Sequence, residues 1–377
     1  MLPQDTAVRI LFVSHSFPSP DAPLDNVGGM QRVAVELFEA FGEVPDVEIV
    51  PVVARGAWKG TTLRTVRFMA DLLRTLPRRA ETADAVLFSS MVTAFLAPLW
   101  RRRMPGVPMA AIAHGRDVTL PTAVYQAWLP RVLRALDLIL PVSTATGEEL
   151  VARGAAPGRV VPLPNGVDLS RFETVPDREA VRRRLVSRGD LPEDAAFLFS
   201  VGRQVERKGT AWFVRTVMPR LPDHVHYWIA GDGPELPAIE AAAEAAGVAE
   251  RVRLLGRVSE TALTEALSAA DLFVMPNVPV AGDMEGFGVV MLEAALSGTP
   301  VVASRLEGIR DVVVDGDNGY FVTPRDAEGY AARITSLLSD RDALAALSKR
   351  AARTSRERFA WPSVARRYAD TLATLTR

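Results

Sequence analysis

Two glutamates, Glu285 and Glu293, flank a glycine-rich stretch, EGFGVVMLE, that follows the apolar run LFVMPN. Carboxylates accept hydrogen bonds from sugar hydroxyls. A helix over this spacing rises about 12 Å, too far for the two carboxylates to share one proton or one metal ion. They suit instead the two hydroxyl-bearing ends of one long ligand. The backbone between them would offer helix N-terminal amide groups to an anion such as a diphosphate. It comprises Gly286, Phe287, Gly288 and Val289.

A second segment, VGRQVERKG at residues 201–209, also follows an apolar run. Arg203 can hold two phosphate oxygens with its planar guanidinium, and Lys208 supplies a point charge. Two such cations can clamp a diphosphate and neutralise it as a leaving group. An ordinary solvated cluster of charges is the alternative.

Three further places put polar or glycine residues near the end of an apolar run. His114 can hydrogen-bond a hydroxyl or a phosphate oxygen, and His15 stands in a similar position, although a histidine before a glycine is often structural. Gly28 and Gly29 open a helical pattern and can bring backbone amides to a phosphate, or form a plain turn. Asp232, in GDGPE, stands in a turn of the nucleotide-loop type that serves equally as an ordinary turn.

The segments that must position these residues alternate between short β-rich apolar runs and longer helical patterns. The apolar runs are VRILFVSHS, DAVLFSS, MAAIAHG and LDLILPVS, followed later by FLFSVGR, HYWIAGDG, VRLLGRV, LFVMPN, TPVVAS and GYFVTP. This alternation predicts an α/β fold with buried parallel sheets. In such sheets ligands bind beyond the carboxyl ends of the strands, where the candidate residues stand.

The length of 377 residues exceeds one ordinary core and predicts two domains, which implies a cleft. A stretch rich in Pro, Asn, Asp and charge, PLPNGVDLSRFETVPDREAVRRRL, separates the two series of strands and predicts the connection. We place an N-terminal doubly wound domain at 1–166, a second at 167–357 and a terminal helix at 358–377.

Composition narrows the function classes. The net charge is −1 with both signs balanced, which describes a globular protein for which nucleic acid is not a favoured partner. The chain has no cysteine, so disulfides, thiolate nucleophiles and cysteine metal sites are excluded. The N-terminal apolar run is too short for a membrane span and lacks signal-peptide features, so a cytoplasmic location is the default expectation.

Together these segments resemble the retaining GT-B glycosyltransferases of family 4, the glycosyl transferases of group 1. The resemblance covers nearly the whole chain and is most specific in the order VGRQVERKGT, GDGPEL, LGRVSETAL, EGFGVVMLEAALSGTPVVAS and DGDNGYFV. It implies two Rossmann-like domains that face a central cleft. The second domain would hold the nucleotide sugar, and the last helix would cross back to the first.

The resemblance also implies residue roles. Glu285 would contact hydroxyls of the transferred sugar and Glu293 the ribose. Arg203 and Lys208 would clamp the diphosphate, and His114 would contact the sugar from the opposite wall.

Two further contacts follow from the same resemblance. The backbone at Arg257 and Val258 would meet the base. The loop at Gly28 and Gly29 would close on the phosphates or meet the acceptor.

The implied activity is transfer of a hexosyl unit from a UDP-sugar, GDP-mannose or ADP-sugar to a glycan, lipid-linked or small-molecule acceptor. The resemblance also implies a part in cell-envelope glycan or glycolipid synthesis. Retention would come from front-face attack without a covalent intermediate, because no second-face carboxylate nucleophile is evident. No cofactor is expected. Asp315 and Asp317 have the form of a D-x-D metal motif, but their place in VVDGDNGYFV indicates a turn, and we expect metal to be dispensable.

Other interpretations stay open. A sugar-nucleotide epimerase of similar fold, or a non-catalytic nucleotide-sugar-binding protein, would also bind a diphosphate.

Residues 58–79 are basic and helical in period, and Arg101 to Arg103 add further charge. This helix either contacts an anionic membrane, which would place the protein at the inner face of the cell membrane, or faces the domain core with its apolar stripe.

Overall fold

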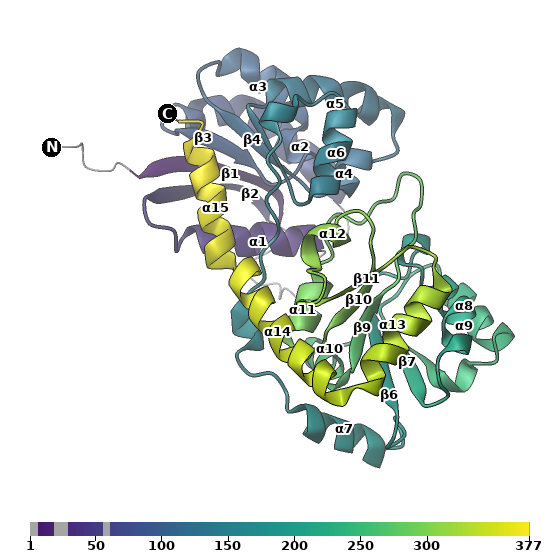
Figure 1. Ribbon diagram of the computed structural model, residues 1–377. Coiled ribbons are helices and arrows are strands. Elements are labelled where there is room, and N and C mark those ends of the chain that lie inside the picture. Colours follow the sequence, from purple (N-terminus) through teal and green to yellow (C-terminus); the bar gives the residue numbers. More distant parts are fainter. Residues whose placement is uncertain (1–6, 19–28, 56–60, 377) are drawn as a thin grey trace. The chain divides into compact units, whose positions relative to one another are not determined.

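The computed structural model describes residues 7–18, 29–55 and 61–376, and the chain divides into two compact units (Figure 1). Unit 1 comprises Met1–Val167 together with Phe359–Arg377, and unit 2 comprises Asp168–Arg358. The chain first passes from unit 1 to unit 2 between Val167 and Asp168, inside the stretch rich in Pro, Asn and Asp.

Unit 1 is built on a parallel five-stranded sheet with the strand order β2-β1-β3-β4-β5. Every residue of its last three strands is buried, as a parallel sheet covered on both faces requires. The strand order reverses between β1 and β3, which makes that point the topological switch point of the sheet. The strands are β1 (Val8–Phe17), β2 (Val47–Arg55), β3 (Ala85–Phe88), β4 (Met109–Ala113) and β5 (Leu138–Pro141).

Helices of unit 1 cover the sheet, and the last helix of the chain belongs to this unit. Trp361 of that helix donates from Nε1 to Glu36 at 2.6 Å, and the Tyr368 hydroxyl donates to the carbonyl of Leu163 at 3.2 Å. The helices are α1 (Gly29–Phe41), α2 (Thr61–Ala80), α3 (Ala97–Arg103), α4 (Arg116–Thr119), α5 (Ala123–Ala135), α6 (Thr144–Ala152) and α15 (Trp361–Ala373), with short 3₁₀ turns η2 (Thr93–Leu96) and η3 (Pro157–Arg159).

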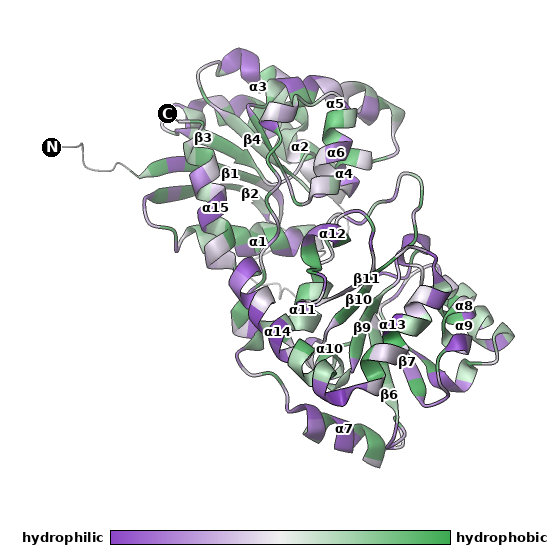
Figure 2. Ribbon diagram, viewed as in Figure 1, coloured by the Kyte–Doolittle hydropathy of each residue, from purple (hydrophilic) through white to green (hydrophobic). Residues whose placement is uncertain are grey.

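Unit 2 is built on a parallel six-stranded sheet with the order β11-β10-β9-β6-β7-β8. Counted from the first strand of the unit, this is the 3-2-1-4-5-6 order of dinucleotide-binding folds, with its switch point between β6 and β9. Figure 2 shows the hydrophobic strands at the centre of the unit. They are β6 (Ala196–Val201), β7 (Val225–Ala230), β8 (Val252–Gly256), β9 (Leu272–Met275), β10 (Val301–Ser304) and β11 (Gly319–Val322).

The helices of unit 2 alternate with its strands along the chain. They are α7 (Arg178–Ser187), α8 (Thr210–Thr216), α9 (Leu236–Ala245), α10 (Glu260–Ala269), α11 (Val290–Leu296), α12 (Ile309–Val312), α13 (Ala327–Ser339) and α14 (Arg341–Phe359), with 3₁₀ turns η4 (Leu169–Phe172), η5 (Glu206–Lys208), η6 (Met218–Arg220) and η7 (Ala249–Arg251). Among the residues described in either unit, no helix is both long and apolar enough to cross a membrane.

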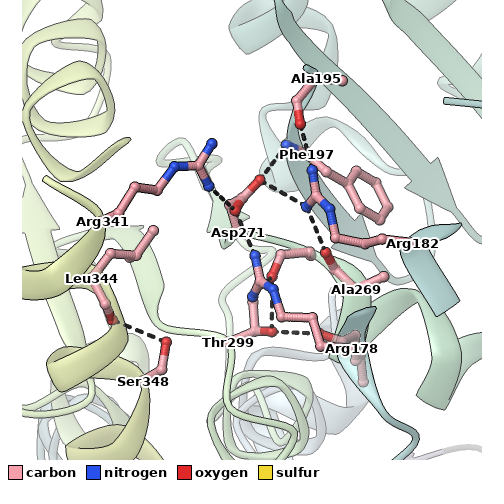
Figure 3. Close-up of polar contacts among 12 residues, drawn as sticks. Arg178, Arg182, Ala195, Phe197, Ala269, Asp271, Thr299, Arg341, Leu344 and Ser348 are labelled. Carbon is pink, nitrogen blue, oxygen red and sulfur yellow. Dashed lines mark hydrogen bonds and ion pairs between the residues drawn. The ribbon is translucent and has the colours of Figure 1, made fainter. Parts of the chain in front are cut away.

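A fully buried carboxylate, Asp271, ties two helices to the sheet of unit 2 (Figure 3). It stands just before β9 and pairs with Arg178 and Arg182 of α7 and with Arg341 of α14. It also accepts the backbone amide of Phe197 in β6 at 2.7 Å. Because Asp271 stands at the amino end of β9, it lies at the opposite end of the sheet from the carboxyl ends of the strands, where it links α7 and α14 to β6.

Candidate functional site

The candidate site in unit 2 lies where β6 and β9 end, at the switch point of the sheet. A small pocket there is lined by residues of both loops, including Gly202, Lys208 and Asn277. Gly209 has φ +66°, and a Cβ at this position would lie 2.1 Å from the carbonyl oxygen of Pro276. Only glycine fits here. The loop after β6 therefore reaches the loop after β9.

Glu285 is the centre of this site and is 8% exposed. Its Oε2 accepts from Lys208 Nζ at 2.6 Å, from Asn277 Nδ2 at 3.0 Å and from Arg207 Nη1. All three donors use the same oxygen. The other oxygen, Oε1, accepts no hydrogen bond from the described residues.

The charges around Glu285 keep it ionised. Burial opposes ionisation, but the charges of Lys208 and Arg207 outweigh burial and lower the pKa of Glu285 to about 2. Burial also lowers the pKa of Lys208, and the Glu285 carboxylate opposes this change. The site therefore presents a fixed anion that can only accept hydrogen bonds.

Arg207 and Asn277 belong to this site, although sequence reasoning did not single them out. Arg207 also donates from Nε to Asp283 at 3.1 Å. The available signal was adjacency, since Arg207 precedes Lys208 in ERKG and Asn277 ends the run LFVMPN.

Arg203 is the second cation of the predicted diphosphate clamp. Its side chain is exposed, and it makes no hydrogen bond or ion pair with the described residues. The neighbouring Gln204 is buried and donates to the carbonyls of Gly202 and Ala230. Lys208 thus joins Glu285, Arg203 faces solvent, and diphosphate clamping stays a prediction for both.

Glu293 makes a separate ion pair. Its Oε1 accepts from Arg171 Nη1 at 2.7 Å, and Arg171 Nη2 donates to Glu260 at 2.6 Å. Burial alone would lower the pKa of Arg171, but the two carboxylates raise it. Arg171 lies in η4, within the segment that the sequence indicated only as a domain connection.

The stretch between the two glutamates is not the continuous helix assumed for the spacing of about 12 Å. Helix α11 begins at Val290, so Glu293 stands in its first turn and Glu285 precedes it in an irregular loop. Gly288 has φ +85°, which an α-helix cannot contain. The amides of residues 286–289 thus belong to a loop before the helix, with Phe287 buried.

A second loop supports Glu285 from the end of β10. Glu307 accepts the backbone amide of Glu285, and the Gly308 amide donates to the Glu285 carbonyl at 3.1 Å. Glu307 has φ +45°, a strained conformation for a residue other than glycine. Burial raises the pKa of Glu307, and the Glu285 amide opposes this change.

The GDG turn is shaped by packing against the loop after β6. A Cβ at Gly231 or Gly233 would lie 1.9 Å or 2.1 Å from the carbonyl oxygens of Gly202 and Gln204. Asp232 is exposed, and its Oδ1 accepts the Gly233 amide at 2.8 Å. These contacts account for the glycines without a ligand.

Two other predicted binding positions of unit 2 follow β8. Arg257 is exposed and Val258 half-buried, directly after the last residue of that strand. Their contact with a base stays a prediction.

Asp315 and its neighbours form a turn, in which Asp315 Oδ1 accepts the Phe321 amide at 2.8 Å. No cluster of three or more metal-binding side chains occurs in the described parts of the chain.

In unit 1, polar residues gather at the carboxyl ends of the strands. His114 Nε2 lies 2.9 Å from the Ser89 carbonyl, and Asp117 accepts the amides of His114 and Met91 at 2.8 Å and 2.9 Å. His15 Nδ1 is buried and has no partner within residues 7–18, 29–55 and 61–376. Burial lowers the pKa of His15, and the charge of Asp117 opposes this change.

The predicted glycine loop is only partly described. Gly28 lies outside the described residues, and Gly29 is the first residue of α1. The predicted contact of this loop with phosphates or acceptor stays a prediction, as does the contact of His114 with the sugar.

Each half of the chain matches a family model of glycosyltransferases. Residues 27–171 match the family described as Glycosyltransferase Family 4, and residues 195–340 match Glycosyl transferases group 1. The first match lies mostly in unit 1, and the second lies in unit 2.

Curated relatives include a D-inositol 3-phosphate glycosyltransferase of Geodermatophilus obscurus, 38% identical over 58% of this chain and 49% of that protein. A GDP-mannose-dependent alpha-(1-6)-phosphatidylinositol monomannoside mannosyltransferase of Mycolicibacterium smegmatis is 32% identical over 74% of this chain and 73% of that protein. The match thus spans about half of the first relative and nearly three quarters of the second.

Solved structures with the same architecture include Anabaena HepE in complex with UDP, with a TM-score of 0.76 and 19% identity over 97% of this chain and 100% of that chain. Sucrose-phosphate synthase from Thermosynechococcus elongatus gives a TM-score of 0.75 with 20% identity over 98% and 99% of the two chains. At this identity the likeness shows the fold.

Proposed function

We propose that this chain, which belongs to the family 4 glycosyltransferases of GT-B fold, is a hexosyltransferase that moves a hexosyl unit from a nucleoside-diphosphate sugar with retention. The observation that carries this proposal is the Glu285 carboxylate. It is ionised, held through Oε2 by three donors and placed at the switch point of the sheet. Such a fixed acceptor suits the hydroxyls of the transferred sugar.

The donor would contact several groups of unit 2. Lys208 would turn from Glu285 to the diphosphate, because its flexible stem can exchange one anion for another. Arg203, exposed and without an ion pair to any described residue, would supply the second cation. Glu293 would contact the ribose, and the backbone at Arg257 and Val258 would meet the base.

In the proposed reaction, the bond between the anomeric carbon and the diphosphate oxygen breaks while the acceptor oxygen bonds to the same face of the sugar. The acceptor proton passes to the leaving phosphate oxygen. Negative charge grows on the diphosphate, and cations already in place lower the cost of that charge. We propose that the reaction needs neither a covalent intermediate nor a metal ion.

The candidate donors are UDP-sugars, GDP-mannose and ADP-sugars. The M. smegmatis relative is named for GDP-mannose, and the Anabaena structure contains UDP. Relatives are also named for inositol phosphate and for lipopolysaccharide core synthesis. We propose a glycan, lipid-linked or small-molecule acceptor within glycan or glycolipid synthesis, in the cytoplasm.

Incubation with a panel of these donors tests the proposal. Slow hydrolysis of one donor, with release of the nucleoside diphosphate, supports a transferase. An isomerised sugar would indicate an epimerase instead, and binding without turnover a non-catalytic protein. A thermal-shift screen selects the base, since a nucleotide at about 100 times its Kd should stabilise the protein by about 2.7 kcal/mol.

We further propose that helix α2 contacts the anionic lipids of the inner membrane face. Two apolar side chains near its start are solvent-exposed, Leu63 at 64% and Val66 at 61%. Arg67 and Arg74 are exposed on the same helix, so the surface complements negative charge. Residues 58–60 of the predicted segment lie outside the described residues.

One of the neighbouring arginines has its charge balanced by a carboxylate. Arg101 is half-buried and pairs with Asp137, and Arg103 donates to the Leu73 carbonyl. Sedimentation with phosphatidylcholine vesicles, with and without phosphatidylglycerol, tests the contact. Binding should need the anionic lipid and should be lost in Leu63→Ser/Val66→Ser. Val124→Ser, which changes a residue 80% exposed on α5, is the matched control. Equal sedimentation of all variants contradicts the contact.

A further inference from the structure

Each of the two predicted donor-contacting glutamates is held by an arginine from another segment of unit 2. Arg207 pairs with Glu285, and Arg171 pairs with Glu293. We propose that Arg207 and Arg171 are positioning residues, the first for contact with the transferred sugar and the second for contact with the nucleoside. The inference rests on the proposed function and adds to it which residues set the two ends of the donor site.

Arg207 is anchored on both its backbone and its side chain. Its carbonyl accepts the Val278 amide at 2.9 Å, which fixes η5 against the loop after β9. Its guanidinium bridges Asp283 and Glu285 and is 17% exposed. A planar guanidinium holds two carboxylates in a set geometry, which an ammonium group cannot do.

This anchor matters when the donor arrives. Lys208 now contributes one of three hydrogen bonds to Glu285 Oε2. Once Lys208 turns to the diphosphate, Arg207 and Asn277 still hold that oxygen. Glu285 thus keeps its charge and its orientation while Oε1 stays open to a sugar hydroxyl.

Arg171 performs the corresponding task for Glu293. Its two terminal nitrogens reach two different helices, at Glu293 of α11 and Glu260 of α10. The guanidinium also lies over the Phe172 ring, 5.5 Å from its centroid. Helix α10 starts just after residues 257–258, the segment predicted to meet the base. Arg171 therefore ties the predicted ribose contact to the predicted base contact.

The two arginines share no partner among these ion pairs, so their effects should be separable. Arg171 acts where a nucleoside diphosphate alone would bind. Arg207 acts where only the sugar of the intact donor would reach. Removing a residue with a purely structural function would instead lower nucleotide affinity and kcat together.

The experiment compares Arg171→Ala and Arg207→Ala with Arg215→Ala, an exposed arginine of α8. Affinity for UDP and GDP is measured by calorimetry, and hydrolysis of the active donor gives kcat and KM. Loss of a charged hydrogen bond changes an equilibrium or a rate by roughly tenfold to a hundredfold. Arg171→Ala should weaken nucleotide binding by that factor. Arg207→Ala should leave nucleotide binding unchanged and lower kcat by that factor.

The pH profile adds a readout that a structural change would not move. Glu285 faces Arg207, Lys208 and Glu307, besides the neutral Asn277, and Asp283 pairs with Arg207. Removing Arg207 takes away one of the two cations that lower the Glu285 pKa. The acid limb of the kcat profile in Arg207→Ala should therefore move to higher pH, and in Arg171→Ala it should stay in place.

Two results would overturn the inference. Equal loss of nucleotide affinity and kcat in both variants, or values equal to those of Arg215→Ala, overturn it. Arg171→Lys and Arg207→Lys keep the charge without the planar fork, and each should show a weaker form of the same selective loss. These variants decide the matter if an alanine variant fails to fold. A wild-type protein that binds and cleaves no donor would refute the proposed function itself, a different outcome.

Discussion

Replacing Asp271 with alanine tests whether a buried charge cluster supports the scaffold of the candidate site. The carboxylate is 0% exposed and faces three arginines and one backbone amide. Breaking a buried ion pair by removing one partner costs about 3–5 kcal/mol. Arg341 is 61% exposed and Arg178 is 35% exposed, so both can return to water. We therefore take the lower end of this range, about 3 kcal/mol, as the cost of breaking the ion pairs of Asp271.

The Phe197 amide adds to this cost. It loses its acceptor inside the sheet, which adds about 1 kcal/mol. The expected total is about 4 kcal/mol, or about 8–16 °C in the melting temperature of a unit of this size. Burial lowers the pKa of Arg178 and Asp271 opposes this change, so the variant should also hold Arg178 less firmly in its charged form.

Differential scanning calorimetry of the full chain measures the loss, with circular dichroism to confirm the folded state before heating. Asp190→Ala is the matched control, because Asp190 pairs with Arg253 at 2.7 Å where the two side chains are 29% and 47% exposed. An exposed pair contributes about 0–1 kcal/mol. If Asp271→Ala destabilises the protein no more than Asp190→Ala, the cluster does not support the scaffold.

Three further predictions concern the Glu285 site and the packing of Gly166. Glu285→Ala and Lys208→Ala should each lower donor turnover by about a hundredfold or more with an unchanged circular dichroism spectrum, because each removes a preorganised charge; near-normal turnover in either would remove the site assignment. The Glu285 pKa falls from 4.5 to about 2 on folding, so its stabilisation, about 3 kcal/mol, is complete above pH 4.5 and disappears as the pH falls through 2. Urea unfolding at several acidic pH values should show this loss in the wild type and not in Glu285→Gln. Gly166→Ala places a Cβ 2.3 Å from the Trp361 ring and should cost about 1–3 kcal/mol, whereas Gly158→Ala, with nothing within 4 Å, should be tolerated in the same thermal unfolding assay.

The two parallel sheets were readable from the sequence because a strand buried on both faces is a continuous apolar run. The run AFLFSV became β6 and the run LFVM became β9, both buried throughout apart from the last residue of β6. Lys208 follows the first of these runs and Glu285 follows the second, and the two residues meet at one site. Strands of a parallel sheet end at one edge, so their following loops meet there.

Local spacing was less informative where glycine intervened. The interval from Glu285 to Glu293 resembled a helix, but Gly288 at φ +85° delays the helix to Val290. Nor does spacing tell Arg203 from Arg207, because both precede Lys208 within the same short segment. The 3₁₀ turn η5 directs Arg207 to Glu285, while Arg203 stays exposed.

The segment that begins with Glu285 shows most clearly which features the sequence determines and which only the tertiary structure decides. By itself, the sequence determined that two carboxylates and a glycine-rich loop follow a buried strand, because burial and backbone freedom leave local patterns in residue type. Only the tertiary structure decided which cation holds each carboxylate. Arg171 and Glu293 are 122 positions apart, and the order of the strands, which leaves no periodic trace in the sequence, brings them within 2.7 Å.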